Sequence, residues 1–204
     1  MKMKQSYAVP FLFLATVLAG MLSPMQSAVN GQVGKELGDG NASAVVSFGS
    51  GLVVMAIIIV ARKSTRRQFA SIPSRIKANR IPWWSWFAGL CGAMVVFSEG
   101  ASASLLGVAT FQTTLISEMG ISGLIGDRFG IGVDIKQPVN SPRVLGALLA
   151  IAATVLVVSP NWQAPSYIGL AVLPFLAGLL AGWQPAGNSA VGRETGSMLV
   201  SITW

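Results

Sequence analysis

Polar residues inside apolar runs are the first candidates for chemistry in this sequence. Gln26 and Asn30 lie four residues apart in the first apolar run, so their amides share one face of a helix. Amides in that setting either hydrogen-bond to a neighbouring helix or line the path of a polar molecule through a membrane. The residues alone leave both interpretations open.

Two acids, Glu99 and Glu118, also fall inside apolar runs. An ionised carboxylate there costs about 2.5 kcal/mol or more, so each acid needs a partner, a proton or water. Glu118 lies near the middle of its run, which makes it a candidate for the path and for coupling to a proton. Glu99 lies near the outer end of its run, where 100–104 can already be loop, and we expect an interfacial carboxylate there.

The residue inventory excludes several kinds of chemistry. The 204 residues include no histidine and a single cysteine, Cys91, which excludes His-based acid–base catalysis, disulfide frameworks and Cys/His metal sites. No nucleophile and base stand in a recognisable arrangement. We therefore expect no enzyme activity, no cofactor and no metal.

Helices that cross a membrane must position the polar candidates. Apolar residues make up 52% of the chain and charged residues 10%, and the mean hydropathy is +0.64, a composition typical of membrane proteins. A run of about 20 apolar residues can cross a bilayer. The sequence predicts an all-α polytopic bundle with six spans: Tyr7–Val29, Ala42–Ala61, Trp83–Leu106, Val108–Gly126, Val144–Val158 and Tyr167–Gly187.

Local signals define the ends of these spans. The first run is too long for the apolar region of a secretory signal peptide, so we interpret it as a membrane helix. Asn41 is expected to cap the second span, and the Gly, Pro and charged residues of 127–143 indicate a loop. Trp83, Trp84 and Trp86 begin the third span, where aromatic side chains anchor a helix at the membrane interface.

The cations predict the orientation of the chain. If the N-terminus lies in the cytoplasm, every Lys and Arg except Lys35 falls on the cytoplasmic side, as the positive-inside rule requires. The net charge of +7 then follows from topology. We interpret the basic segment 62–80 as a cytoplasmic loop rather than a patch for anionic lipid or nucleic acid, and we expect no nucleic-acid partner.

An internal repeat divides the chain. Segments 18–43 and 176–201 align without a gap at an offset of 158 residues, and 12 of 26 positions are identical. Five predicted spans separate the starts of the copies, so the second copy enters from the opposite side of the membrane. We expect a first five-helix repeat over 1–158 and a truncated start of an inverted second repeat over 159–204. A homo- or hetero-dimer partner is one candidate source of the missing half.

The repeat doubles the set of polar candidates. Gln26 and Asn30 recur as Gln184 and Asn188. Amides at matching depths in two inverted helices converge near a pseudo-twofold axis, where such transporters bind their substrates. The candidates for a substrate path are therefore Gln26, Asn30, Glu118, Gln184 and Asn188. Each copy also contains a proline that is expected to kink its helix, and these are Pro24 and Pro185.

Three stretches together resemble a known family. They are MLSPMQSAVNGQVGKELG near the N-terminus, PWWSW at 82–86, and ISGLIGDRFGIGV with SPRVLGALLA around the fourth loop. They resemble the YdcZ-type inner-membrane exporters of the drug/metabolite transporter (DMT) superfamily. The resemblance covers residues 8–158 and restarts near 167. It implies a bacterial inner-membrane protein of five-span units, and it implies no particular substrate.

The sequence thus predicts a function. It is export of an unidentified small molecule across the bacterial inner (plasma) membrane by a secondary transporter with alternating access. The lipid bilayer, the substrate and a coupling proton would be its partners. The alternative is a non-transporting membrane scaffold or an inactive remnant of a duplicated transporter. The chain departs from the family's pattern at Glu118, where a glutamine is expected, and at Arg128, where a histidine is common.

Overall fold

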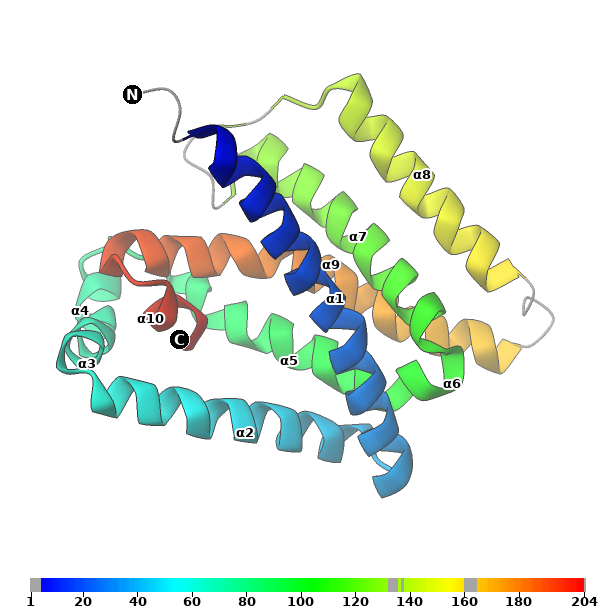
Figure 1. Cartoon of the computed structure of the whole chain (residues 1–204), viewed down its shortest axis with the longest axis horizontal. Coiled ribbons are helices and arrows are strands. Elements are labelled where there is room, and N and C mark those ends of the chain that lie inside the picture. The colour runs from blue at the N-terminus through cyan, green and yellow to red at the C-terminus, as the bar shows by residue number, and fades with distance from the viewer. Residues whose placement is uncertain (1–4, 132–135, 137, 160–164, 204) are drawn as a thin grey trace.

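Every element in the described part of the computed structural model, residues 5–131, 136, 138–159 and 165–203, is helical, so the predicted all-α class is confirmed (Figure 1). The elements are α1 (Gln5–Leu37), α2 (Gly40–Ala61), α3 (Lys63–Ala70), α4 (Ile72–Lys77), the 3₁₀-helix η1 (Trp83–Phe87), α5 (Ala88–Ser98), the π-helix η2 (Glu99–Ala103), α6 (Ser104–Leu106), α7 (Val108–Phe129), α8 (Ser141–Val158), α9 (Pro165–Thr195) and α10 (Met198–Thr203).

Five helical stretches among the described residues are long and apolar enough to cross a membrane. They are Pro10–Leu37, Gly40–Ala61, Trp83–Leu106, Ser141–Val158 and Tyr167–Thr195. The remaining predicted span corresponds to α7, which has 22 residues like α2 but carries more polar side chains. Six helices of spanning length therefore match the six predicted spans.

Several predicted boundaries differ from the structure, since α1 continues to Leu37 rather than Val29 and α9 to Thr195 rather than Gly187. The N-cap of α2 is Asp39, whose carboxylate accepts a hydrogen bond from the Asn41 amide nitrogen at 2.8 Å, so the prediction of Asn41 as the cap was wrong. Gly38 ends α1 in a left-handed conformation (φ 67°), and this turn brings Asp39 to the start of the next helix. The α7 helix continues into the predicted loop until Gly130 (φ 79°) ends it.

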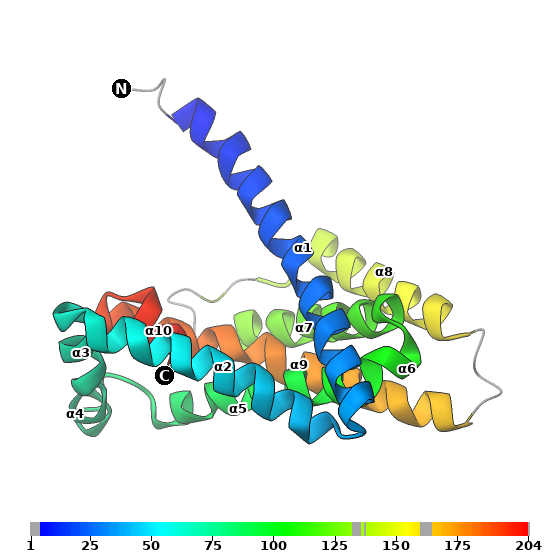
Figure 2. The same ribbon diagram turned by 60° about the horizontal axis from the view of Figure 1, so that its bottom comes forward.

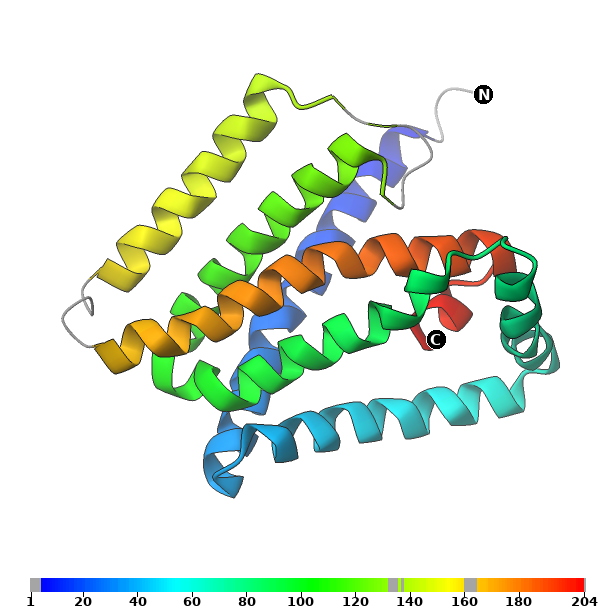
Figure 3. The same ribbon diagram turned by 180° about the vertical axis from the view of Figure 1, so that it is seen from behind.

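The α9 helix lies in the middle of the bundle, packed between α5 and α7 (Figures 1 and 3). The α8 helix lies beside α7 at one edge, and α2 lies beyond α5 at the other. The α1 helix crosses this layer, and its N-terminal part projects away from it (Figure 2). All described side chains from 10 to 26 are exposed, so this part of α1 contributes an apolar surface rather than core.

Small residues allow the closest helix contacts. A Cβ added to Gly34 of α1 would lie 2.0 Å from the Gly100 carbonyl oxygen of η2. A Cβ added to Gly178 of α9 would lie 2.5 Å from the Leu115 carbonyl oxygen of α7. Backbones that approach this closely are typical of membrane helices, which associate through packing rather than through the hydrophobic effect. The α1–η2 and α9–α7 contacts therefore depend on glycine.

The two aligned segments end their long helices in the same way. The α1 helix ends at Leu37 and is followed by Gly38 with φ 67°, and α9 ends at Thr195 and is followed by Gly196 with φ 68°. The next helix starts two residues after each glycine, at Gly40 and at Met198. The helix ends thus correspond position by position at the offset of 158 residues found in the sequence.

Side-chain contacts repeat as well. Ser43 donates a hydrogen bond from Oγ to the Asn30 carbonyl oxygen at 2.7 Å, and Ser201 donates the equivalent bond to the Asn188 carbonyl oxygen. In Figure 1, α1 runs from upper left to lower right, whereas α9 runs from right to left. The two segments therefore share their local structure and run in opposite directions.

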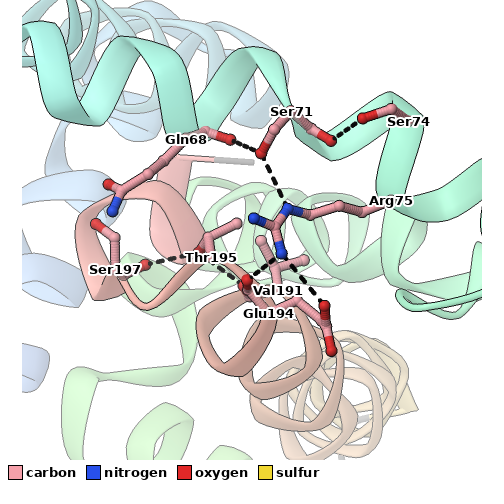
Figure 4. A network of polar contacts seen from close by, with 8 residues as sticks. All are labelled: Gln68, Ser71, Ser74, Arg75, Val191, Glu194, Thr195 and Ser197. Atoms are coloured by element: carbon pink, nitrogen blue, oxygen red, sulfur yellow. Dashed lines mark hydrogen bonds and ion pairs between the residues drawn. The ribbon is translucent and has the colours of Figure 1, made fainter.

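The segment between α2 and α5 is tied to the C-terminal end of α9. Arg75 of α4 forms an ion pair with Glu194, with 3.3 Å between Nη1 and Oε2, and also donates to the Glu194 carbonyl oxygen (Figure 4). Its Nε donates to Ser71 Oγ at 3.0 Å, which fixes the guanidinium on the neighbouring helix end. This contact holds α4 against α9.

We expect Arg75→Gln to lower the free energy of unfolding by about 1 kcal/mol, because partly exposed ion pairs and single hydrogen bonds each contribute that much or less. The measurement is the melting temperature of the purified protein in detergent. Lys77→Gln in the same helix is the control, since Lys77 is exposed. Equal melting temperatures for the two variants would show that the Arg75 contact contributes nothing to stability.

Candidate functional site

The bundle has a central, open-sided cavity of about 530 Å³ between α1, α2, α5, α7, α9 and α10. Most of its wall is apolar, which is typical of small-molecule sites. Its polar lining comes from three elements of the bundle: Ser23 and Gln26 of α1, Glu99 of η2, and Gln184, Asn188 and Ser189 of α9. The aligned helices α1 and α9 therefore face the same cavity.

Glu99 is the central charged residue of this site. Its carboxylate is 2% exposed and accepts hydrogen bonds from Ser27 Oγ at 2.6 Å and from Asn30 Nδ2 at 2.5 Å. The prediction of an interfacial carboxylate beside a loop was therefore wrong. The helix continues through 99–103 as a π-helix, and α1 covers its polar face.

Close backbone packing explains how α1 reaches Glu99. The π-helical turn is a local widening of the kind often found at functional sites, and Gly100 follows Glu99 within it. Gly34 of α1 lies directly against Gly100, and Gly40 lies against Ala101. This contact brings the side of α1 that carries Ser27 and Asn30 onto the carboxylate.

A further hydrogen bond extends the network to α7. Gln112 donates from Nε2 to Ser27 Oγ at 2.6 Å and to Ser23 Oγ at 3.3 Å. Its Oε1 is buried and has no hydrogen-bond partner among the described residues. Neither Ser27 nor Gln112 was identified from the sequence. The spacing of Ser23, Ser27 and Asn30 along one helix face was the signal that could have indicated them.

The predicted amides occupy two kinds of place. Gln26, Gln184 and Asn188 line the central cavity. Asn30 is 5% exposed and binds Glu99 instead, so its amide supports the carboxylate. The Gln184 side chain lies over Gly92 of α5, where an added Cβ would be 2.9 Å from Nε2. A role for these amides in binding substrate stays a prediction.

Glu118 lies apart from the cavity wall. It is 5% exposed and packs beside Gly178 at the α7–α9 contact. Its neighbours Leu115 and Met119 line the cavity. The predicted path role of Glu118 is untested. The two predicted kinks also stay predictions, since α1 and α9 continue as helices through Pro24 and Pro185.

The predicted tryptophan anchors lie in η1, at the start of the third span. Trp83 is 70% exposed and Trp86 is 53% exposed, as expected for side chains that face lipid or its headgroups. Trp84 packs against Trp183 of α9, with 6.5 Å between ring centroids. Anchoring itself remains a prediction.

Electrostatics give the cavity a negative character. Glu99 is the only charged residue that lines it in the described part of the chain. The cations of α3 and α4 lie at the far end of α2 (Figure 1). A buried carboxylate beside amide groups favours ligands that carry positive charge or hydrogen-bond donors. Within the described residues, no cluster of His, Cys, Asp and Glu is suited to a metal ion.

The all-helical bundle, its membrane-spanning helices and its internal polar cavity define a multi-pass membrane protein of the transporter class. The chain belongs to the YdcZ family of the drug/metabolite transporters, whose family model, described as "Putative inner membrane exporter, YdcZ", matches residues 11–156, more than half of the chain. No curated protein and no solved structure matches the chain. The resemblance found in the sequence is thereby confirmed.

Proposed function

We propose that this protein exports small molecules across the inner membrane by alternating access and binds them in the central cavity. The observation that carries the proposal is the convergence of Gln26, Glu99 and Gln184 on one cavity from α1, η2 and α9. In inverted-repeat transporters, substrates bind where equivalent helices of the two repeats meet. The opposite directions of α1 and α9 support the same arrangement (Figure 1).

The chemistry of the cavity favours a small organic cation as the substrate. The Glu99 carboxylate supplies negative charge, and the Gln26 and Gln184 amides supply carbonyl acceptors. Phe48 adds an aromatic face to the same wall, and aromatic faces attract cations in desolvated sites. A proton is the coupling ion of this proposal, with Glu99 and Glu118 as the buried acids that can carry it.

In the proposed membrane orientation, the N-terminus lies in the cytoplasm. The basic α3–α4 segment is then cytoplasmic too. Residues 1–158 form the first five-span unit, and 159–204 begin an inverted second unit. A partner chain would pack on the projecting part of α1. Large exposed apolar side chains such as Phe11 and Phe13, each 71% exposed, support this.

Transport by the reconstituted chain tests the proposal. Proteoliposomes would be offered three sets of compounds of similar size: small alkylammonium ions, neutral polyols and carboxylates. Uptake of radiolabelled compounds into the proteoliposomes is measured, because exchange of one cation for one proton moves no net charge. We expect uptake of the alkylammonium ions and none of the other two sets. Transport of carboxylates or polyols would contradict the proposed substrate class, and the absence of any uptake would favour the non-transporting scaffold.

Replacing both cavity glutamines gives a sharper prediction. We expect Gln26→Ala with Gln184→Ala to reduce alkylammonium transport at least about tenfold, since each amide lost from a binding site costs about 1 kcal/mol. Gln32→Ala is the matched control, because Gln32 lies on α1 but outside the cavity wall and binds Glu36. Arg66→Ala, in the basic segment, should also transport normally. Unchanged flux in the double variant would show that the two amides do not contribute to the substrate path.

A further inference from the structure

One wall of the central cavity follows a single face of α5 and η2. The residues of this wall are Gly92, Val95, Val96 and Glu99. Their spacing places all four on one side of the helix. Glu99 comes seven residues after Gly92, which corresponds to a rise of about 10 Å along the helix axis. The carboxylate therefore stands at one end of this wall, and a residue without a side chain stands at the other end.

The α9 helix provides the facing wall, because it lies beside α5 and runs in the opposite direction (Figures 1 and 3). Ala177 of α9 belongs to the same buried cluster as Ala103 of η2, so this part of α9 faces the Glu99 end. Gln184 comes two helical turns later in α9, and its side chain lies over Gly92. The Gln184 amide and the Glu99 carboxylate thus stand at opposite ends of the cavity.

The Gly92 end of the cavity is polar and aromatic but carries no charge. A Cβ added to Gly92 would lie 2.9 Å from Gln184 Nε2 and 3.4 Å from Cζ of the Phe48 ring. The missing side chain therefore leaves room between the amide and the ring. Glu99 is the only charged residue of the cavity wall in the described part of the chain. A hydroxyl group at the Gly92 end can hydrogen-bond to the amide, whereas a second ammonium there would lack an opposite charge.

We propose that the site selects compounds with one ammonium group and a neutral polar group at the far end of an apolar chain. The ammonium lies at Glu99, the chain lies along Val95 and Val96, and the polar group lies at Gln184 beside Gly92. Gly92 is then the residue that determines how long the chain can be. This inference rests on the proposed cation site and adds to it the length and the second end of the ligand.

Binding to the purified full chain in detergent, measured by isothermal titration calorimetry, tests the predicted ligand. We expect hexanolamine to bind about fivefold more tightly than hexylamine, because its hydroxyl adds one hydrogen bond to the Gln184 amide. Hexanediamine should bind more weakly than hexanolamine, since its second charge has no partner in the wall. Equal affinities for hexanolamine and hexylamine, or tighter binding of hexanediamine, would overturn the neutral polar end.

Gly92→Ala tests the position of that end. The added methyl group meets the far end of the flexible Gln184 side chain, so the helix should still fold while the amide is displaced. We expect hexanolamine to bind about fivefold more weakly and the short ethanolamine to bind as it does to the wild type. Gly89→Ala in the same helix is the matched control, because a Cβ there meets no atom within 4 Å. Equal losses for the two ligands, or the same affinities as in Gly89→Ala, would overturn the role of Gly92.

Glu99→Gln separates this inference from the proposed function. Hexanolamine and ethanolamine both place their ammonium at Glu99, so the variant should lose binding of both. If the wild type binds neither compound, the cation site is wrong and the inference fails with it. If both compounds bind through Glu99 but Gly92→Ala does not discriminate between them, the cation site stands and the length limit at Gly92 is wrong.

Discussion

Glu99→Gln is expected to abolish transport of alkylammonium ions, to at most about a tenth of the wild-type rate, in a protein that still folds. The substitution removes the only charge on the cavity wall in the described part of the chain. A glutamine keeps the shape of the side chain and one acceptor oxygen for Ser27 or Asn30. The measurement is the uptake of radiolabelled alkylammonium ion by the reconstituted variant, compared with its melting temperature in detergent.

A second substitution at the same position separates function from stability. Glu99→Ala leaves the donors of Ser27 and Asn30 without their acceptor, and both residues are buried. Each unsatisfied buried donor costs about 1–3 kcal/mol, so we expect the free energy of unfolding to fall by about 2 kcal/mol or more. Glu99→Gln should lower the free energy of unfolding by clearly less, because glutamine keeps one acceptor oxygen.

The control for both variants is Glu36→Gln. Glu36 lies on α1, the helix that packs against Glu99, but it is exposed and accepts a hydrogen bond from Gln32. Glu36→Gln should change neither the transport rate nor the free energy of unfolding. If Glu99→Gln transports as well as Glu36→Gln, the carboxylate is a structural anchor for α1 and the proposed cation site is wrong.

Gly34→Ala is expected to have the largest effect on folding. A methyl group at this position would lie 2.0 Å from the Gly100 carbonyl oxygen and 2.6 Å from the Gly100 carbonyl carbon, so backbone would have to move. Adding a methylene to a well-packed core typically costs about 1–3 kcal/mol, and here the obstacle is the backbone of the π-helix, which cannot move aside as a side chain can. We therefore expect Gly34→Ala to lower the free energy of unfolding by at least about 3 kcal/mol.

The consequence of Gly34→Ala reaches the site, because the same contact sets α1 against Glu99. We expect little protein in the membrane fraction and a melting temperature far below that of the wild type. Gly49→Ala in α2 is the matched control, since a Cβ there meets no atom within 4 Å, and alanine is the better helix former. Similar stability of the two variants would mean that α1 and η2 are not packed as described.

Much of the architecture could be predicted from the sequence because it depends on local composition. Apolar runs of bilayer length determine where helices form, and the predicted spans from Trp83 and from Val108 begin where η1 and α7 begin. Gapless matches between 18–43 and 176–201 indicated equivalent turns, which the structure has at Gly38 and Gly196. The family followed from motifs of the same kind.

The environment of Glu99 could not be predicted, because its partners are 69 and 72 residues away in the chain. Local patterns place it near small residues, which fit either a loop or a close helix contact. The choice between these depends on Gly34, which lies on another helix. The same reason applies to Gln112, whose partner Ser27 is 85 residues away.

The sequence by itself determined that this is a helical membrane protein of the YdcZ family, because hydropathy, small residues and motifs act over short stretches. Only the tertiary structure decided which polar residues share a cavity. It placed Gln26 and Gln184 on the central wall, buried Asn30 against Glu99, and set Glu118 apart at a helix contact. The physical reason is that a helix face becomes a site only when other helices cover the rest of it.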